Sequence, residues 1–243
     1  GEDLSLWIRG DYLISGITLN RFFALHVVAL PIVLLGLVVL HILALHEVGS
    51  NNPDGIDIKK NKDENGIPKD GIPFHPYYTV HDLLGVGVFF FIFFIVVFFF
   101  PEMGGLFLEK PNFEPANALK TPAHIAPVWY FTPFYAMLRA VTVDFMGLPA
   151  KFWGVVVMGG AIAILFVLPW LERSPVRSIR YKGWLSKIAL AIFAVSFVIL
   201  GYLVLVPATE GRTTVAQLLT VLYFLHFLLL PLYPRNEKTK HAA

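Results

Sequence analysis

Cysteine is absent from the 243-residue chain, and charged side chains are scarce. Without cysteine the chain cannot form a disulfide, ligate an iron–sulfur cluster through thiolates or attach a c-type haem covalently. Charged residues make up 15% of the sequence and the formal net charge is only +2, so no basic surface for nucleic acid is indicated. These absences exclude disulfide-built, thiolate-ligating and nucleic-acid-binding classes.

The sequence is rich in hydrophobic residues. Hydrophobic residues make up 56% of the chain and the mean hydropathy is +0.67, a balance typical of integral membrane proteins. Uncharged runs of 18 residues or more recur along the chain, and about 20 helical residues cross a ~30 Å hydrocarbon core. We therefore predict an all-α integral membrane protein with about five transmembrane helices. They are expected over 22–46, 83–100, 152–171, 188–209 and 213–234.

The loops between these runs differ in charge and length. Basic residues gather in the linker 49–78, in the loop 172–182 and in the C-terminal tail, which fall on one side of a five-helix chain. By the positive-inside bias this side faces the cytoplasm, as in a bacterial inner membrane. The N-terminus and the loop 101–151 then face outward. A loop of about 50 residues is more often functional than idle, and we expect it to carry short helices.

Three histidines, His26, His41 and His46, lie in the first apolar run. An ionisable group inside a membrane is costly and usually functional. On a regular helix His26 and His41 are ~60° apart in azimuth and ~22 Å apart along the axis, whereas His46 lies ~160° from His26. This spacing lacks the one-turn interval of a zinc or di-metal site, and two separate imidazoles on one face suit two separate haems. Pro31 is expected to kink the helix between them.

Four stretches of the sequence are informative together: RFFALHVVALP…HILALHEVGSNNP (21–53), IPFHPYYTVHDLLG (72–85), PANALKTPAHIAPVWYF (115–131) and YAMLRA (135–140). Together they resemble cytochrome b, the membrane subunit of ubiquinol–cytochrome c oxidoreductase. The resemblance runs through the whole chain but covers only the family's second half. It implies three parts: residues 1–52 ending an N-terminal haem-binding half, residues 53–78 as a cytoplasmic linker, and residues 79–243 as a C-terminal domain containing the quinol-oxidation loop 101–151.

The resemblance implies a subunit of a respiratory quinol:cytochrome c oxidoreductase. Electrons would pass from ubiquinol at an outer site through two b-type haems to ubiquinone at a cytoplasmic-side site, coupled to proton translocation. The implied partners are a Rieske iron–sulfur protein, a c-type cytochrome, the N-terminal half of cytochrome b and the lipid membrane, in a homodimeric complex without nucleic acid.

The resemblance also implies roles for individual residues. His26 and His41 would each ligate one haem iron. A histidine and a carboxylate can hydrogen-bond the two carbonyls of a quinone and supply protons, and His46, Tyr130, Tyr135 and Asp82 are the expected catalytic residues. Quinone reduction is assigned to His46, Ser50, Phe74, His81 and Asp82. Quinol oxidation is assigned to Pro127, Val128, Trp129, Tyr130, Phe131 and Tyr135.

Three departures from the family pattern stand out. The family has glutamate where this chain has Val128. Valine can neither bind quinol through a carboxylate nor accept its proton. Asp144 is a candidate replacement for that proton acceptor, although a surface role for Asp144 is equally consistent. The mitochondrial branch has lysine where this chain has His81. The interval from His26 to His41 is one residue longer than in that branch and resembles the split photosynthetic relatives.

The sequence contains only one of the two histidine-bearing helices that the family uses for its haems. His124 and His226 do not replace the other pair, because one is in the outward loop and the other is alone in the last apolar run. Each haem is therefore expected to need a second ligand from outside this chain, and we expect a subunit that is split or part of a longer chain.

Two other functions remain open at this point. A photosynthetic-type complex that oxidises plastoquinol is favoured slightly by the histidine interval. A non-redox membrane scaffold or transporter bundle would treat His26, His41 and Asp82 as core or transport groups.

Overall fold

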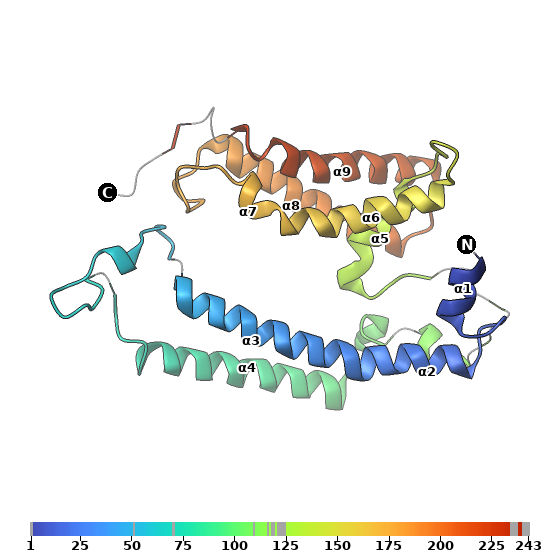
Figure 1. Cartoon of the computed structure of the whole chain (residues 1–243), viewed down its shortest axis with the longest axis horizontal. Coiled ribbons are helices and arrows are strands. Elements are labelled where there is room, and N and C mark those ends of the chain that lie inside the picture. Colours follow the sequence, from blue (N-terminus) through green and yellow to red (C-terminus); the bar gives the residue numbers. More distant parts are fainter. Residues whose placement is uncertain are drawn as a thin grey trace. The chain divides into compact units, whose positions relative to one another are not determined.

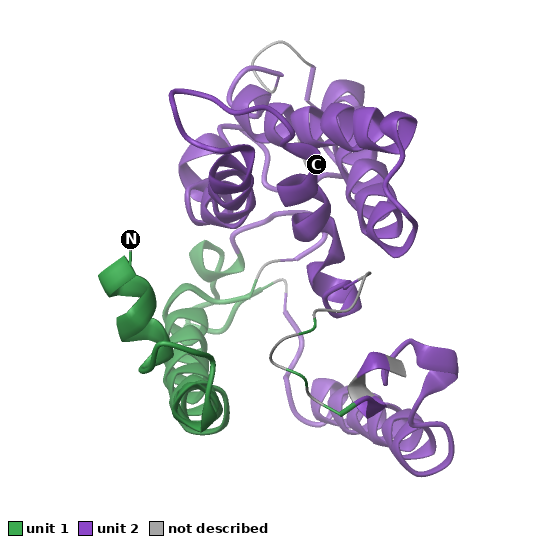
Figure 2. Ribbon diagram, turned by 90° about the vertical axis from the view of Figure 1, so that its right-hand side faces the viewer, with its two compact units in different colours: residues 1–51, 58–69, 115–121 green, residues 52–57, 70–114, 122–243 purple. Residues whose placement is uncertain are grey.

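The computed structural model describes residues 2–50, 52–69, 71–108, 110–115, 117, 120, 125–233 and 238–239. In this part of the chain the regular elements are helices, and the only strand-like pairings are two isolated bridges, Lys62–Pro68 and Phe145–Leu148 (Figure 1). The prediction of an all-α fold is confirmed. The chain divides into two compact units (Figure 2). Unit 1 comprises residues 1–51, 58–69 and 115–121, and unit 2 comprises residues 52–57, 70–114 and 122–243.

Unit 1 is built on one long apolar helix. The elements α2 (Gly16–Ala24), η1 (Leu25–Ala29) and α3 (Leu30–Val48) follow one another without a break over 33 residues. A short helix, α1 (Glu2–Arg9), precedes them and ends at Gly10, whose positive φ of 77° is easy for glycine. The Thr18 hydroxyl donates to the Arg9 carbonyl oxygen (2.7 Å), which fixes the end of α1 to the first turn of α2.

Pro31 is accommodated inside this helix by a π-helical turn. Proline has no N–H for the carbonyl four residues earlier, and its ring crowds that carbonyl. The chain responds over η1, where the Leu30 N–H reaches the carbonyl oxygen of Leu25, five residues back. Such π turns are a common local adjustment around proline and recur at functional sites.

Unit 2 contains α4 and a helical bundle. The helix α4 spans Tyr77–Phe99, and its side chains are largely exposed. In the bundle, α5 packs against α6, α8 and α9, and α8 packs against α9 (Figure 1). The bundle helices are α5 (Thr132–Ala140), α6 (Ala150–Phe166), α7 (Leu168–Leu171), α8 (Trp184–Leu205) and α9 (Glu210–Leu229).

The long loop before α6 carries short helices, as predicted. These are η3 (Met103–Gly105), η4 (Lys110–Phe113), η5 (Trp129–Phe131) and α5. One further short helix, η2 (Ile58–Lys60), lies in the linker of unit 1.

Small residues allow the bundle helices to approach closely. Gly154 of α6 lies so near α5 that a Cβ added to it would be 2.6 Å from the Leu138 carbonyl oxygen. Small residues at helix contacts are typical of membrane bundles. The buried Tyr223 hydroxyl donates to the Ala161 carbonyl oxygen (2.8 Å) and joins α9 to α6. The buried apolar core is made of Ala136, Met137, Ala140, Ala161, Leu200, Val204, Ala216, Leu219, Tyr223 and Phe227.

Four of the five expected membrane spans are single helices of sufficient length in the part of the chain that is described. They are Gly16–Val48, Tyr77–Phe99, Trp184–Leu205 and Glu210–Leu229. The expected span 152–171 is instead divided into the 17-residue α6 and the one-turn α7. The break is at Val167, two residues before Pro169, whose missing N–H interrupts the helix. The 17 residues of α6 extend ~25 Å, the lower end of what crosses a bilayer.

Candidate functional site: a histidine-bearing membrane helix and the elements at its ends

The three histidines of the opening run lie on the long helix of unit 1. His26 is inside the π turn η1, and His41 and His46 are in α3. A π turn uses more residues per turn than an α-helix and therefore rotates less per residue. This reduces the ~60° offset that a regular helix would give His26 and His41. The structure thus brings the two imidazoles closer to one face than the sequence spacing alone indicates.

Both imidazoles are free to accept a ligand. The side chains of His26 and His41 are exposed, and neither has a hydrogen bond or ion pair to any residue that the structure describes. Between them Gly36 leaves open space where a side chain would project. A neutral imidazole with an unused nitrogen is a standard axial ligand of haem iron. The residues present therefore fit one axial ligand for each of two haems. Among the described residues there is no cluster of three or more His, Cys, Asp or Glu side chains suited to another metal ion.

The end of α3 is closed by a lysine from the linker. Gly49 follows the last helical residue and has a φ of 87°. The Lys59 ammonium donates to the Glu47 carbonyl oxygen (2.7 Å) and lies 3.5 Å from the His46 carbonyl oxygen. A cation at the negative end of a helix is favourable. Lys59 therefore fixes the turn that carries His46 and, just beyond it, Ser50. Sequence reasoning missed this contact because Lys59 is one of several lysines in a Gly/Pro-rich linker.

The start of α4 gathers aromatic and imidazole groups. Phe74 stacks on Tyr78 with ring centroids 5.9 Å apart, and Tyr78 lies 6.4 Å from the His81 ring. The Nδ1–H of His81 donates to the Tyr77 carbonyl oxygen (2.8 Å), which leaves Nε2 available outward. Asp82 follows on the next position and is exposed. Phe74, His81 and Asp82 are thus brought together on one short segment.

The segment 127–135 is a compact aromatic turn. Trp129 packs edge-on against Tyr130, whose ring is 4.8 Å from Phe131. The Thr132 hydroxyl donates to the Trp129 carbonyl oxygen (2.6 Å), so η5 leads directly into α5. Tyr135 lies in α5 and is half-buried against the bundle core.

The exposed side chains of this segment are Val128, Trp129, Tyr130 and Phe131, whereas Pro127 is half-buried. The structure therefore brings together the six residues assigned to quinol oxidation and anchors them through the buried face of α5, which includes Met137.

Asp144 has a structural partner. Its Oδ1 accepts the backbone N–H of Ala150 (2.7 Å), the first residue of α6. A carboxylate at a helix N-terminus satisfies an otherwise unpaired N–H and interacts favourably with the helix dipole. This contact favours the surface role over the proton-accepting role. His124 and His241 lie outside the described residues.

Two models of one protein family match overlapping parts of the chain. The model described as Cytochrome b(N-terminal)/b6/petB matches residues 1–133, and the one described as Cytochrome b(C-terminal)/b6/petD matches residues 115–224. The expectation that the chain covers only the family's second half is therefore not supported, because the N-terminal model matches more than a hundred of its residues.

The chain is also similar to individual proteins and to a solved structure. It is 63% identical to cytochrome b of Allochromatium vinosum, covering 99% of this chain and 58% of that protein. It is 47% identical to cytochrome b of Rickettsia bellii, covering 98% and 55%. A structure named Hyperthermophilic respiratory Complex III shares 36% identity at a TM-score of 0.82, covering 98% of this chain and 56% of that one. The chain thus spans a little over half the length of these relatives.

Proposed function

Because the chain belongs to the cytochrome b family, we propose that it acts as a membrane subunit of a respiratory quinol:cytochrome c oxidoreductase. In this role it takes electrons from quinol at an outer site and delivers them to quinone at a cytoplasmic-side site, with protons crossing the membrane. The observation that carries the proposal is the placement of His26 and His41 on nearly one face of a single 33-residue apolar helix, with both imidazoles unpaired among the described residues.

The chain is an integral membrane protein. Its long helices expose most of their large apolar side chains, a surface that soluble monomers rarely present. We propose a bacterial inner membrane, with the loops 49–78 and 172–182 and the C-terminus in the cytoplasm, from the bias of lysine and arginine.

His26 and His41 would hold two b-type haems, one nearer each membrane face. When bound, the haems supply the one-electron chemistry, and the protein supplies ligation, spacing and a low-dielectric surrounding. We propose that the second axial ligand of each haem comes from a histidine outside these 243 residues, whether on the same polypeptide or another.

The residues proposed for quinone reduction lie at two element ends. His46 and Ser50 are at the end of α3, and Phe74, His81 and Asp82 are at the start of α4. Imidazole and carboxylate groups can hydrogen-bond quinone oxygens and exchange protons with them, and an aromatic side chain can pack against the ring. The available His81 Nε2 and the exposed Asp82 carboxylate are consistent with this role.

Quinol oxidation is proposed at the aromatic turn 127–135, where Tyr130 and Tyr135 provide hydroxyls within an apolar surface. Val128 offers no proton acceptor, and Asp144 is engaged with Ala150. We therefore propose that the proton leaves through ordered water at this turn. Ubiquinol is the proposed substrate, and a Rieske iron–sulfur protein and a c-type cytochrome are the proposed partners in a homodimeric complex. The similarity to the structure named Hyperthermophilic respiratory Complex III supports this over plastoquinol oxidation.

The test is a haem titration on the purified complex. His26→Ala and His41→Ala should each remove one of two b-type haems, seen as the loss of half of the reduced b-type absorbance. His226→Ala is the matched control, because this histidine is in the spanning helix α9 and stacks on Phe193. Retention of both haems in the first two variants would contradict the ligand assignment.

A further inference from the structure

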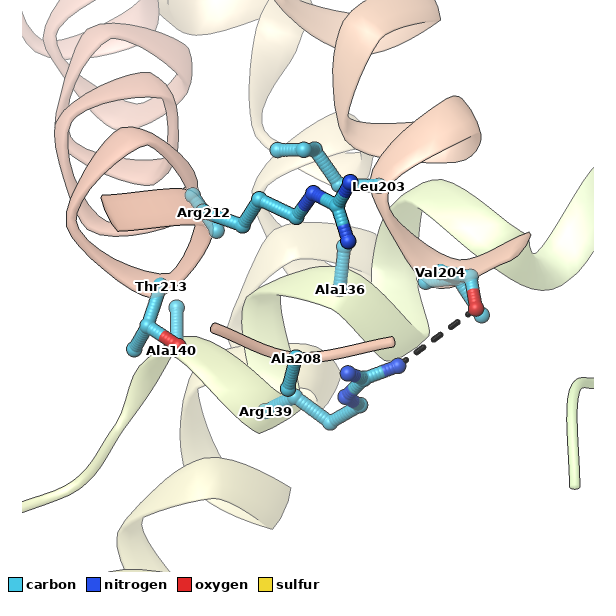
Figure 3. Close-up of a pocket in the computed structure, with 9 residues that line it drawn as sticks. Ala136, Arg139, Ala140, Leu203, Val204, Ala208, Arg212 and Thr213 are labelled. Carbon is cyan, nitrogen blue, oxygen red and sulfur yellow. Dashed lines mark hydrogen bonds between the residues drawn. The ribbon is translucent and has the colours of Figure 1, made fainter. Parts of the chain in front are cut away.

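A small pocket with two arginines opens where α8 ends and α9 begins. Its lining comes from α5, from the end of α8, from Ala208 in the connection and from the first two turns of α9 (Figure 3). Arg139 of α5 and Arg212 of α9 both extend toward the end of α8, where Leu203 and Val204 lie (Figure 3). Two guanidinium groups from distant parts of the sequence thus share one hollow.

The two arginines use few of their donors within the chain. The Nη1 of Arg212 donates to the Pro207 carbonyl oxygen (2.8 Å). The Nη1 of Arg139 makes a long contact to the Val204 carbonyl oxygen (3.5 Å). A guanidinium has five N–H donors, so most remain available. Each arginine thus satisfies one backbone carbonyl oxygen at or just after the end of α8, where helix carbonyls lack partners within the helix. The other donors of both arginines have no partner among the described residues.

No carboxylate compensates these charges among the described residues. Neither arginine forms an ion pair there, and Glu210, two residues before Arg212, does not line the pocket. Elsewhere the same bundle pairs its cations: Arg180 binds Asp54 (2.7 Å), and the mostly buried Lys182 binds Glu172. The two arginines of the pocket have no such carboxylate partner among the described residues.

The pocket must lie at a membrane face. The helices α8 and α9 are both long enough to span a bilayer, and only residues 206–209 connect them. The connection between two spanning helices emerges where phospholipid phosphates lie. The pocket is small, with a volume of about 30 Å³, where about 10–15 Å³ is enough to hold one water molecule. A whole small molecule does not fit, whereas an oxygen of an anion seated at the mouth does.

We propose that Arg139 and Arg212 form a phosphate-binding site, occupied by the phosphate of a phospholipid headgroup or by free phosphate. Guanidinium groups match phosphate oxygens with paired N–H donors, which makes arginine the preferred residue for such anions. The Thr213 hydroxyl in the lining and the positive end of the α9 dipole add to the attraction. An anion here would remove the repulsion between the two cations and tie α5 to α8 and α9.

The experiment measures anion binding to the purified complex after removal of native lipid. Native mass spectrometry would follow titration with dihexanoyl-phosphatidylglycerol below its micellar concentration and, separately, with inorganic phosphate. A charge-assisted hydrogen bond is worth about a tenfold change in affinity or more. Arg212→Gln and Arg139→Gln should each weaken binding of the responding probe about tenfold, and Arg212→Lys should weaken it less because charge is kept.

Lys151→Gln is the control for loss of a cation. Lys151 is exposed at the start of α6 and does not line the pocket, so its variant should bind like the unchanged complex. An unaltered b-type absorbance shows that each variant is assembled. A response to the lipid probe alone identifies a headgroup, and a response to inorganic phosphate identifies the free anion. If neither probe binds saturably, or if the Arg139→Gln/Arg212→Gln double variant binds as well as Lys151→Gln, the proposal is wrong.

Discussion

Replacing Gly154 by alanine should force α6 away from α5. The added methyl group would lie 2.6 Å from the Leu138 carbonyl oxygen and 3.3 Å from Leu138 Cγ. A carbon and a carbonyl oxygen normally approach no closer than about 3.3 Å, so the helices must separate by roughly 0.7 Å. The obstacle is backbone rather than a flexible side chain, so a rotamer change cannot relieve it.

The expected cost follows from this displacement. Overpacking of a well-packed contact costs about 1–3 kcal/mol, and the better helix propensity of alanine offsets about 1 kcal/mol of it. Because α5 carries Tyr135, the shift should also disturb the aromatic turn. A misplacement of about 1 Å can lower a catalysed rate by up to about 100-fold. We expect faster heat inactivation of the purified complex and a substantial loss of quinol oxidation, with the b-type haems retained.

Gly159→Ala provides the matched control in the same helix. No atom lies within 4 Å of a Cβ added at Gly159, so only the gain in helix propensity applies and the complex should be as stable as before or slightly more so. Both properties are measured side by side, as inactivation half-life and as turnover with quinol. Equal behaviour of the two alanine variants would refute the claim that the α5–α6 contact at Gly154 is close.

Three further changes test other contacts. Tyr223→Phe removes the hydrogen bond to Ala161 and should destabilise the complex by about 1 kcal/mol, read from heat inactivation. Arg180→Gln should change stability by less than about 1 kcal/mol, because its ion pair with Asp54 is largely exposed; a larger loss would mean that this pair is not screened by water. Pro31→Ala restores an N–H and should allow the π turn to relax, which would shift the absorption of one b-type haem and leave the other unchanged.

The features that could be predicted from the sequence are those set by residues close together along the chain. The apolar runs identified the spanning helices, because a helix in lipid must be hydrophobic over its whole length. The spacing of His26 and His41 placed them on one face, and the loop 101–151 was expected to carry short helices, which the structure has. These predictions depend on residues that are neighbours along the chain.

Features that depend on distant residues were not predicted. The contact of Gly154 with the Leu138 carbonyl oxygen exists only after α5 and α6 pack, and nothing in either segment identifies its partner. The closure of α3 by Lys59 depends on the path of an irregular linker. The division of the span 152–171 was within reach, since Pro169 was visible, but proline inside a membrane helix is often tolerated.

The π turn at His26 separates two quantities that are usually treated as one, the number of residues between ligands and the angle between them. A helix that contains such a turn can gain or lose one residue next to its proline and keep both imidazoles directed to the same side. Alignment by residue count would then assign a ligand shift where none exists in space. In this helix the π turn beside Pro31 can therefore absorb a change of one residue between His26 and His41 without turning the two imidazoles to different faces.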